Sequence, residues 1–234
     1  AISTQGSVDI KGDETIANAN LSFVDGLAEA QLNIANAKFW SDKAPYLYDL
    51  IIQTEQDHYA LKIGIRTIAV QGGQILLNGN PIKLNGFGRH EDFIASGRGL
   101  NLPLMVKDYQ LMRWTGANSY RTSHYPYSEE EMQLADHEGF LIIDEIPAVS
   151  LQFEDDANIA TRQRLCLQQL DELIARDKNH PSVVMWSVAN EPMTPKLNMN
   201  GSEVLTDPAA AKGKDFLDTL IRRARELDST RLVA

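Results

Sequence analysis

The feature that most constrains the fold is an alternation of short apolar runs with helical patterns after residue 74. Runs such as Phe140 to Ile143 and Val183 to Val188 are almost wholly apolar, which is typical of strands buried on both faces. Strands of this kind, joined by helices, form parallel sheets covered on their faces. This pattern leaves an open sheet and a closed barrel both possible. The predicted strands are 84–88, 118–122, 140–143, 183–188 and the start of a fifth at 231–234; the predicted helices are 103–114, 128–138, the stripe 165–174, and 207–227.

The region before residue 74 has a different rhythm. Leu32 and Ile34, Tyr46 and Tyr48, and then Leu61, Ile63 and Ile65 alternate with polar residues, which favours strands with one solvated face. Such strands predict a β-sandwich, a fold that usually takes about 100 residues. We therefore expect this sandwich to lack its first strands, and we place its end at the Gly72-Gly73 turn. The predicted domains are 1–73 and 74–234, with a hairpin at 74–84.

Polar side chains follow each of the four predicted parallel strands. They are Arg89 to Asp92, Arg121 to Tyr127, Asp144 with Glu145, and Asn190 with Glu191. Because the carboxyl ends of parallel strands lie at one edge of a sheet or barrel, these groups are predicted to converge there. The plain alternative is ordinary loop polarity.

Glu191 is the candidate general acid. A carboxyl group just beyond a hydrophobic strand is expected to be partly desolvated, which raises its pKa toward a value useful for proton donation. The alternative is that Asn190 and Glu191 only cap the strand.

Other chemistries lack their motifs. His90-Glu91 and His137-Glu138 begin zinc-helix motifs, but Ile94 and Leu141 stand where the second histidine is needed. No Gly-x-Ser-x-Gly turn is present, and Gly97-Arg98-Gly99 is too short for a phosphate loop. Carboxylate acid/base chemistry remains, and no metal or cofactor is predicted.

Composition excludes further classes. A net charge of -10 argues against nucleic acid or an anionic membrane as a partner. The single cysteine, Cys166, lies in an apolar helical pattern and is predicted to be a buried, inert thiol. No apolar run reaches the length of a membrane span and no signal segment is seen, so a cytoplasmic location is favoured.

The strand-end residues resemble glycoside hydrolase family 2. The pattern Arg-Asp-x-Asn-His-Pro-Ser-Val-x-x-Trp-Ser-x-x-Asn-Glu-Pro runs from Arg176 to Pro192, and the resemblance also covers 64–66, 86–92, 116–127 and 141–145. It implies an immunoglobulin-like β-sandwich followed by a (β/α)8 TIM barrel, here truncated after about four units. It also implies a carbohydrate substrate and a homo-oligomer in the full-length protein.

The same resemblance assigns roles to residues. Glu191 resembles the acid/base of a retaining glycosidase, Asn190 the neighbour that binds the sugar 2-hydroxyl, and His124 and Asp92 side chains that line the glycone site. The residues expected to support them from behind are Arg89, His90, Arg121 and Glu145. The attacking glutamate of the family lies at the end of the seventh barrel strand, so the chain by itself is expected to be inactive.

Within the family, the residues are more similar to the branch that hydrolyses β-glucuronides than to the β-galactosidase branch. The latter carries a magnesium-binding Glu-x-His after the third strand and Gly-Asn-Glu-Ser after the fourth, whereas this chain has Ala148 to Leu151 and Ala189 to Pro192 there. A family 2 β-galactosidase or other β-glycosidase is the alternative. A non-catalytic carbohydrate-binding or assembly module is the alternative from another class.

Overall fold

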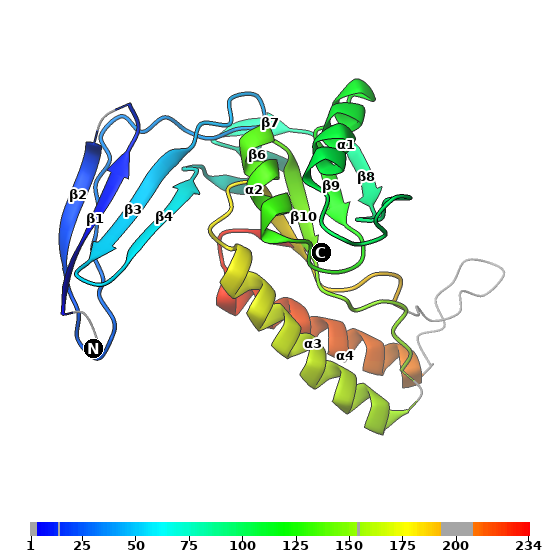
Figure 1. Ribbon diagram of the computed structural model, residues 1–234. Coiled ribbons are helices and arrows are strands. Elements are labelled where there is room, and N and C mark those ends of the chain that lie inside the picture. Colours follow the sequence, from blue (N-terminus) through cyan, green and yellow to red (C-terminus); the bar gives the residue numbers. More distant parts are fainter. Residues whose placement is uncertain (1–3, 14, 154, 193–207) are drawn as a thin grey trace.

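The computed structural model describes residues 4–13, 15–153, 155–192 and 208–234. In these residues the chain forms a four-stranded antiparallel sheet, a three-stranded antiparallel sheet and a five-stranded parallel sheet with four α-helices (Figure 1). None of the described helices is long and apolar enough to cross a membrane.

The first sheet has the strand order β2-β1-β3-β4. Its strands are β1 (Gln5–Lys11), β2 (Thr15–Ser22), β3 (Tyr48–Thr54) and β4 (His58–Ile63). The strand expected at Leu32 and Ile34 is not formed. These two side chains do alternate in burial with their neighbours, but a strand also needs a hydrogen-bonded partner, and β1 and β4 occupy both sides of β3 instead.

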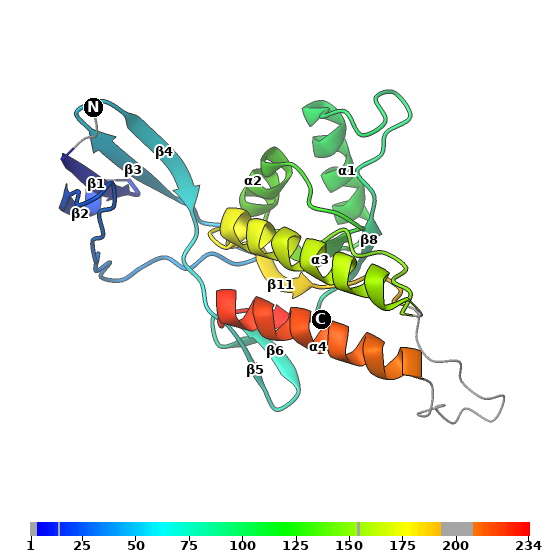
Figure 2. The ribbon, with the colours of Figure 1, turned by 90° about the horizontal axis from the view of Figure 1, so that it is seen from below.

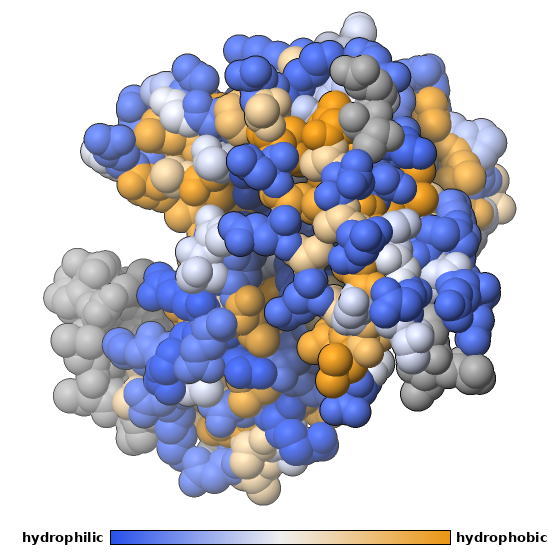
Figure 3. Space-filling view, turned by 90° about the vertical axis from the view of Figure 1, so that its left-hand side faces the viewer, coloured by the Kyte–Doolittle hydropathy of each residue, from blue (hydrophilic) through white to orange (hydrophobic). Residues whose placement is uncertain are grey.

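The β1–β4 sheet is only partly covered. Most residues of β3 and β4 are half-buried or exposed, and Tyr59 is 61% exposed. On the side of the molecule that carries this sheet, apolar and polar groups alternate across the surface (Figure 3). One sheet of a sandwich is therefore present without an apposed second sheet in the described residues.

A three-stranded sheet connects the two regions. Its strands are β5 (Ile68–Gln71), β6 (Gln74–Leu77) and β7 (Asn80–Ile82). The predicted hairpin is confirmed, and Asn78 and Gly79 turn it with φ of 52° and 76°. Because β5 pairs with β6 through Gly72 and Gly73, this sheet includes strands on both sides of the predicted division at residue 73, which stays a prediction.

The parallel sheet follows the chain order without reversal, β12-β11-β10-β9-β8. An open doubly wound sheet reverses its strand order, whereas a barrel adds each strand beside the last, so the order favours a barrel. The strands are β8 (Gly86–Arg89), β9 (Ser119–Thr122), β10 (Leu141–Glu145), β11 (Val183–Ser187) and β12 (Leu232–Val233).

Four helices connect these strands: α1 (Leu102–Trp114), α2 (Glu129–Glu138), α3 (Asp156–Asp177) and α4 (Pro208–Leu227). Helix α2 begins where the Ser128 hydroxyl accepts a hydrogen bond from the Glu131 N–H, and it ends at Gly139 with φ of 75°. The first residue of the helix predicted at 207–227 lies outside the described residues. Helices α3 and α4 lie side by side (Figure 2).

The core lies between these helices and the parallel sheet. Leu170 and Ile174 of α3 and Phe216 and Leu220 of α4 are buried together with Trp186 of β11. Cys166 is also buried, as predicted, and burial raises the pKa of its thiol. The sheet that carries the strand ends is thus the best-covered part of the molecule.

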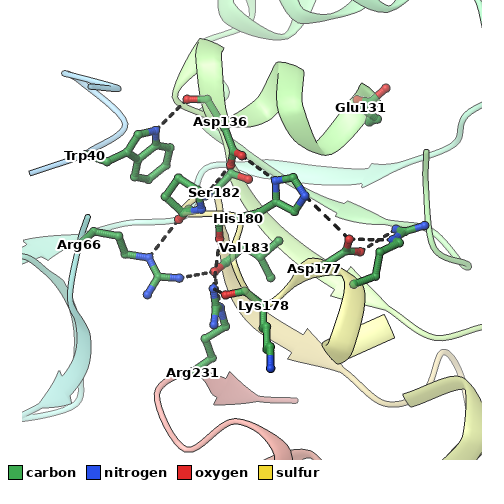
Figure 4. A network of polar contacts seen from close by, with 12 residues as sticks. Trp40, Arg66, Glu131, Asp136, Asp177, Lys178, His180, Ser182, Val183 and Arg231 are labelled. Carbon is green, nitrogen blue, oxygen red and sulfur yellow. Dashed lines mark hydrogen bonds and ion pairs between the residues drawn. The ribbon is translucent and has the colours of Figure 1, made fainter. Parts of the chain in front are cut away.

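A polar network ties the first domain to the amino ends of the parallel strands (Figure 4). Trp40 is fully buried and donates from Nε1 to the Asp136 carbonyl at 2.7 Å. Arg66 donates to the carbonyl oxygens of Pro181 at 3.0 Å and Val183 at 2.6 Å. The segment beside Arg66 must approach closely, because a Cβ added at Gly64 would lie 2.5 Å from Pro181. These contacts fix the amino end of β11.

Candidate active site

The carboxyl ends of β9, β10 and β11 bring five polar side chains together. β9 supplies Arg121 and is followed by His124, β10 ends at Glu145, and β11 ends at Ser187 and is followed by Asn190. The parallel register places these ends side by side, since Arg121 is paired with Ile143 and Glu145 with Ser187. The predicted convergence is therefore present for these three strands.

Glu145 is the centre of this cluster and is fully buried. Its Oε1 lies 2.8 Å from His124 Nδ1, and its Oε2 accepts a hydrogen bond from the Ser187 hydroxyl at 2.6 Å. Arg121 Nη1 lies 3.2 Å from the same Oε2. A buried carboxylate needs such donors, because an unpaired charge in the interior is very costly.

Arg121 connects Glu145 to Asn190. Its Nη2 donates to Asn190 Oδ1 at 3.1 Å, and Asn190 is 5% exposed. The Asn190 backbone is fixed as well, because its N–H donates to the Ala148 carbonyl and its carbonyl accepts from the Ser150 N–H, both at 2.9 Å. The loop after β10 therefore holds the loop after β11.

Glu191 comes directly after this fixed residue and is exposed. It has φ of 44°, a left-handed position that directs the chain away from the strand. The desolvation expected from its position after an apolar strand is not present in the described residues. The physical reason is that the chain turns at Glu191 itself, so that Asn190 is buried while no described element covers the Glu191 side chain.

The loop after β8 contributes less than expected. His90 is exposed, but its ring lies edge-on to the His124 ring with centroids 5.3 Å apart, so it does reach the cluster. Asp92 is exposed and lies 3.8 Å from Arg98, which in turn lies over the Tyr125 ring. The structure thus places Asp92 beside Arg98.

Arg89, at the end of β8, is paired with acidic side chains outside the cluster. It is 7% exposed and forms ion pairs with Asp108 at 2.9 Å and with Glu131 at 3.1 Å, between the rings of Tyr120 and Tyr127. Burial alone would lower the pKa of Arg89, but the charge of Glu131 and the hydrogen bond with Asp108 raise it above its usual range. Arg89 supports the strand end and has no free face for a ligand.

Sequence reasoning missed one member of the cluster, Ser187, and did not indicate the contacts that Glu131 and Asp144 make outside it. Ser187 belongs to the apolar run that predicts a buried strand, and nothing in that pattern indicates its bond to Glu145. Glu131 looks like a capping-box glutamate, yet its side chain accepts from the Tyr120 hydroxyl at 2.8 Å and pairs with Arg89. Asp144 adjoins Glu145, but burial and the neighbouring Asp177 raise its pKa well above the usual range. Asp144 is also fully buried and accepts a hydrogen bond from the Thr122 hydroxyl at 3.0 Å, so it does not face a ligand as a second carboxylate.

Two further observations bound the site. A cavity of about 690 Å³ lies at the opposite ends of the strands, lined among others by Leu61, Arg66, Lys178 and Arg231. Its lining includes none of the strand-end groups, so the converging side chains define the candidate site and the cavity does not. Among the residues that the structure describes, no group of three or more His, Cys, Asp or Glu side chains could hold a metal ion.

Comparison with known families identifies the chain. The domain described as "Glycosyl hydrolases family 2, TIM barrel domain" matches residues 68–234, and the domain described as "Glycosyl hydrolases family 2" matches residues 2–66. The chain belongs to glycosyl hydrolase family 2. The parallel sheet is accordingly part of a TIM barrel, and the β1–β4 sheet is part of the sandwich-type domain of this family, which confirms the predicted fold.

Among family 2 proteins, the chain is 42% identical to the β-glucuronidase of Rattus norvegicus over 216 residues, which are 88% of this chain and 31% of that protein. It is 46% identical to the β-glucuronidase of Paenibacillus borealis over 178 residues, 70% of this chain and 30% of the other. The chain thus spans under a third of the length of these relatives.

Solved family 2 structures agree. A β-glucuronidase from an uncultured Clostridium sp. superposes with a TM-score of 0.85 at 38% identity, covering 100% of this chain and 38% of the other. A β-glucuronidase from Ruminococcus gnavus, in complex with C6-substituted uronic isofagomine, gives a TM-score of 0.84 at 36% identity, covering 98% of this chain and 37% of the other.

Proposed function

We propose that the complete protein that contains this chain hydrolyses β-glucuronides with retention of configuration, with Glu191 as the general acid/base. The observation that carries the proposal is the cluster at the ends of β9, β10 and β11, in which Glu145 and Arg121 hold His124 and Asn190, the residue that directly precedes Glu191. The similarity to proteins named β-glucuronidase supports the substrate class.

In this proposal Asn190 and His124 bind glycone hydroxyls, and Asp92 lines the outer part of the glycone site. Glu191 donates a proton to the departing glycosidic oxygen and later removes one from the attacking water. Retaining hydrolysis also needs a nucleophilic carboxylate about 5 Å from the acid. In this proposal that group is supplied by a part of the complete protein that these 234 residues do not include, as is consistent with a chain that spans under a third of the length of its relatives.

The exposure of Glu191 adds a requirement to this proposal. Because Glu191 is exposed in the part of the chain that the structure describes, the proposal requires the aglycone and the rest of the barrel rim to cover it before it transfers a proton. The proposal also includes a homo-oligomeric complete protein, which light scattering after size-exclusion chromatography measures directly.

The test is an assay of the complete reading frame expressed as one protein. We expect hydrolysis of 4-nitrophenyl β-glucuronide with a kcat/KM at least about 100-fold above that for the matching β-galactoside, because a site for a carboxylate leaves buried polar groups unpaired with a neutral sugar. Proton NMR of the first product should show the β-anomer.

Three results would contradict the proposal in different ways. A preference for the β-galactoside would assign the protein to the alternative branch of the family. Binding without turnover would favour the non-catalytic module. Robust turnover by residues 1–234 alone would mean that the nucleophile lies within this chain.

A further inference from the structure

Glu145 has contacts that go beyond those of an ordinary buried carboxylate. It forms hydrogen bonds or ion pairs with three side chains from the ends of two strands: Arg121 and His124 at the end of β9, and Ser187 at the end of β11. It is fully buried, so it has no route to a ligand of its own. Its backbone N–H is bound too, by the Thr122 hydroxyl at 2.9 Å. Whatever Glu145 does at this site, it does through its neighbours.

The contact with His124 determines which ring nitrogen carries the proton. Oε1 of Glu145 is an acceptor, since the carboxylate already receives donors from Arg121 and Ser187 on Oε2. His124 Nδ1, 2.8 Å away, must therefore be the N–H. This leaves Nε2 as the ring nitrogen available to a ligand. The His124 side chain is 24% exposed, which is enough for Nε2 to meet one.

The contact through Arg121 determines the direction of the Asn190 amide. Arg121 can only donate, so the atom that it contacts at 3.1 Å must be the Asn190 oxygen. The NH2 group of Asn190 is then the part left for a ligand. Arg121 is itself held in this orientation by its ion pair with Oε2 of Glu145 at 3.2 Å.

We propose that Glu145 is the positioning residue that sets the hydrogen-bonding polarity of both candidate sugar-binding side chains, so that Asn190 offers a donor and His124 offers Nε2 to the glycone. This inference rests on the proposed function for its glycone, but the two orientations belong to the chain itself. Glu145 acts as one charged anchor for two groups on different strands.

Charge is what makes a carboxylate necessary here. Three donors converge on two oxygens, and a glutamine would turn its own NH2 toward at least one of those donors. Either the His124 contact on one oxygen, or the Arg121 and Ser187 contacts on the other, would lose its acceptor. Glu145→Gln keeps the volume of the side chain, but it is expected to release His124 and Asn190 from their fixed donor and acceptor orientations.

The experiment has an activity arm, performed on the complete protein. We expect Glu145→Gln to lower kcat/KM for an aryl β-glucuronide about 100-fold, on the scale seen when an orienting carboxylate is neutralised. With the 2-deoxy analogue of the same substrate the loss should be clearly smaller, because the donor on Asn190 then has no 2-oxygen to bind. In a His124→Ala/Asn190→Ala background, Glu145→Gln should cost no more than about threefold.

Glu131→Gln is the matched control. Glu131 is also fully buried and also paired with an arginine, Arg89, but it does not touch the cluster. It should lower the melting temperature as Glu145→Gln does, and leave the ratio of kcat/KM for the 2-hydroxy and 2-deoxy substrates unchanged. An equal change of that ratio in both variants would reduce Glu145 to a structural role and overturn the inference.

A second arm does not depend on activity. Nitrogen-15 NMR of histidine-labelled wild-type protein should show His124 with its proton on Nδ1, and Glu145→Gln should remove that preference. If Glu145→Gln does not fold, Glu145→Asp, one methylene shorter, should shift the same signal. A wild-type His124 with an unprotonated Nδ1 would overturn the inference even if the complete protein is an active glucuronidase. Conversely, loss of the proposed function would leave this measurement standing.

Discussion

The two ends of the parallel strands carry polar networks that differ in how their side chains are hydrogen-bonded. At the amino ends, His180 Nδ1 lies 2.6 Å from Asp136 Oδ2, the Ser182 N–H donates to Asp136 Oδ1, and Arg231 donates to the carbonyls of Val183, Lys178 and His180 (Figure 4). At the carboxyl ends, Glu145 contacts one ring nitrogen of His124 and Arg121 contacts the Asn190 amide oxygen, and among the described residues no side chain is hydrogen-bonded to His124 Nε2 or to the Asn190 NH2 group.

This difference separates stability from function on one sheet. The amino-end network uses its donors on backbone carbonyls and on Asp136, and it joins the amino ends of the strands to Trp40 and Arg66. The carboxyl-end network uses one half of each side chain for orientation and leaves the other half for a ligand. Substitutions at the first should lower stability, and substitutions at the second should lower activity.

The largest expected effect is on catalysis. In the complete protein, Glu191→Gln should lower kcat/KM for phenyl β-glucuronide by about 10²–10⁴-fold, because that leaving group needs a proton. For 2,4-dinitrophenyl β-glucuronide, whose leaving group needs none, the loss of the first step should be far smaller. Since Glu191 is exposed, the melting temperature should not change. Equal losses for both substrates would remove the acid role.

The next effect is on stability at the other end. Asp136→Ala should destabilise the protein by about 3 kcal/mol, because it removes a buried carboxylate that pairs with the half-buried His180 and accepts from the buried Ser182 N–H. Hydrogen exchange of the 181–187 amides and the melting temperature measure this. His137→Ala is the control, since that neighbouring side chain is 76% exposed. A large loss of kcat in the folded fraction of Asp136→Ala would break the comparison.

Two serines, Ser182 just before β11 and Ser187 at its carboxyl end, allow the two networks to be compared within one strand. Ser187→Ala removes one donor to Glu145 and should lower kcat/KM by about fivefold, the equivalent of one hydrogen bond of about 1 kcal/mol. Ser182→Ala removes a buried hydroxyl that has no hydrogen-bond partner among the described residues, and it should be neutral for both activity and stability. The reverse outcome would mean that the serine at the amino end is the functional one.

The smallest effect is a pH dependence. Burial alone would lower the pKa of His180, but its hydrogen bond with Asp136 and the charges of Asp136 and Asp177 raise it above the usual range. A raised folded-state pKa contributes stability that is fully present below pH about 6.5 and is lost as pH rises through the folded value, with a slope of at most about 1.4 kcal/mol per pH unit. Melting temperatures between pH 6 and 9 should show this decline, and His180→Asn should flatten it.

Much of the fold could be predicted because its signals are local. The apolar runs around Ile142 and Val184 indicated strands buried on both faces, and Ser128 and Gly139 marked the ends of α2. Convergence of Arg121, Glu145 and Asn190 followed from strand direction alone. Sequence reasoning failed where a residue's role depends on a distant partner. Leu32 and Ile34 alternate without pairing, and Glu131 binds Arg89 instead of closing a capping box.

The sequence by itself determined the family 2 motif, the alternation of strands and helices along the chain, and the identity of the polar groups that follow the strands. These features depend on periodicity and turn chemistry, which act between near neighbours. Only the tertiary structure decided which of those groups are free. In the folded protein Arg89 is paired with Glu131, Glu191 is exposed, and Ser187 and Arg121 both contact Glu145. The physical reason is that a buried charge must find partners wherever packing places them, and packing joins residues that are far apart in the chain.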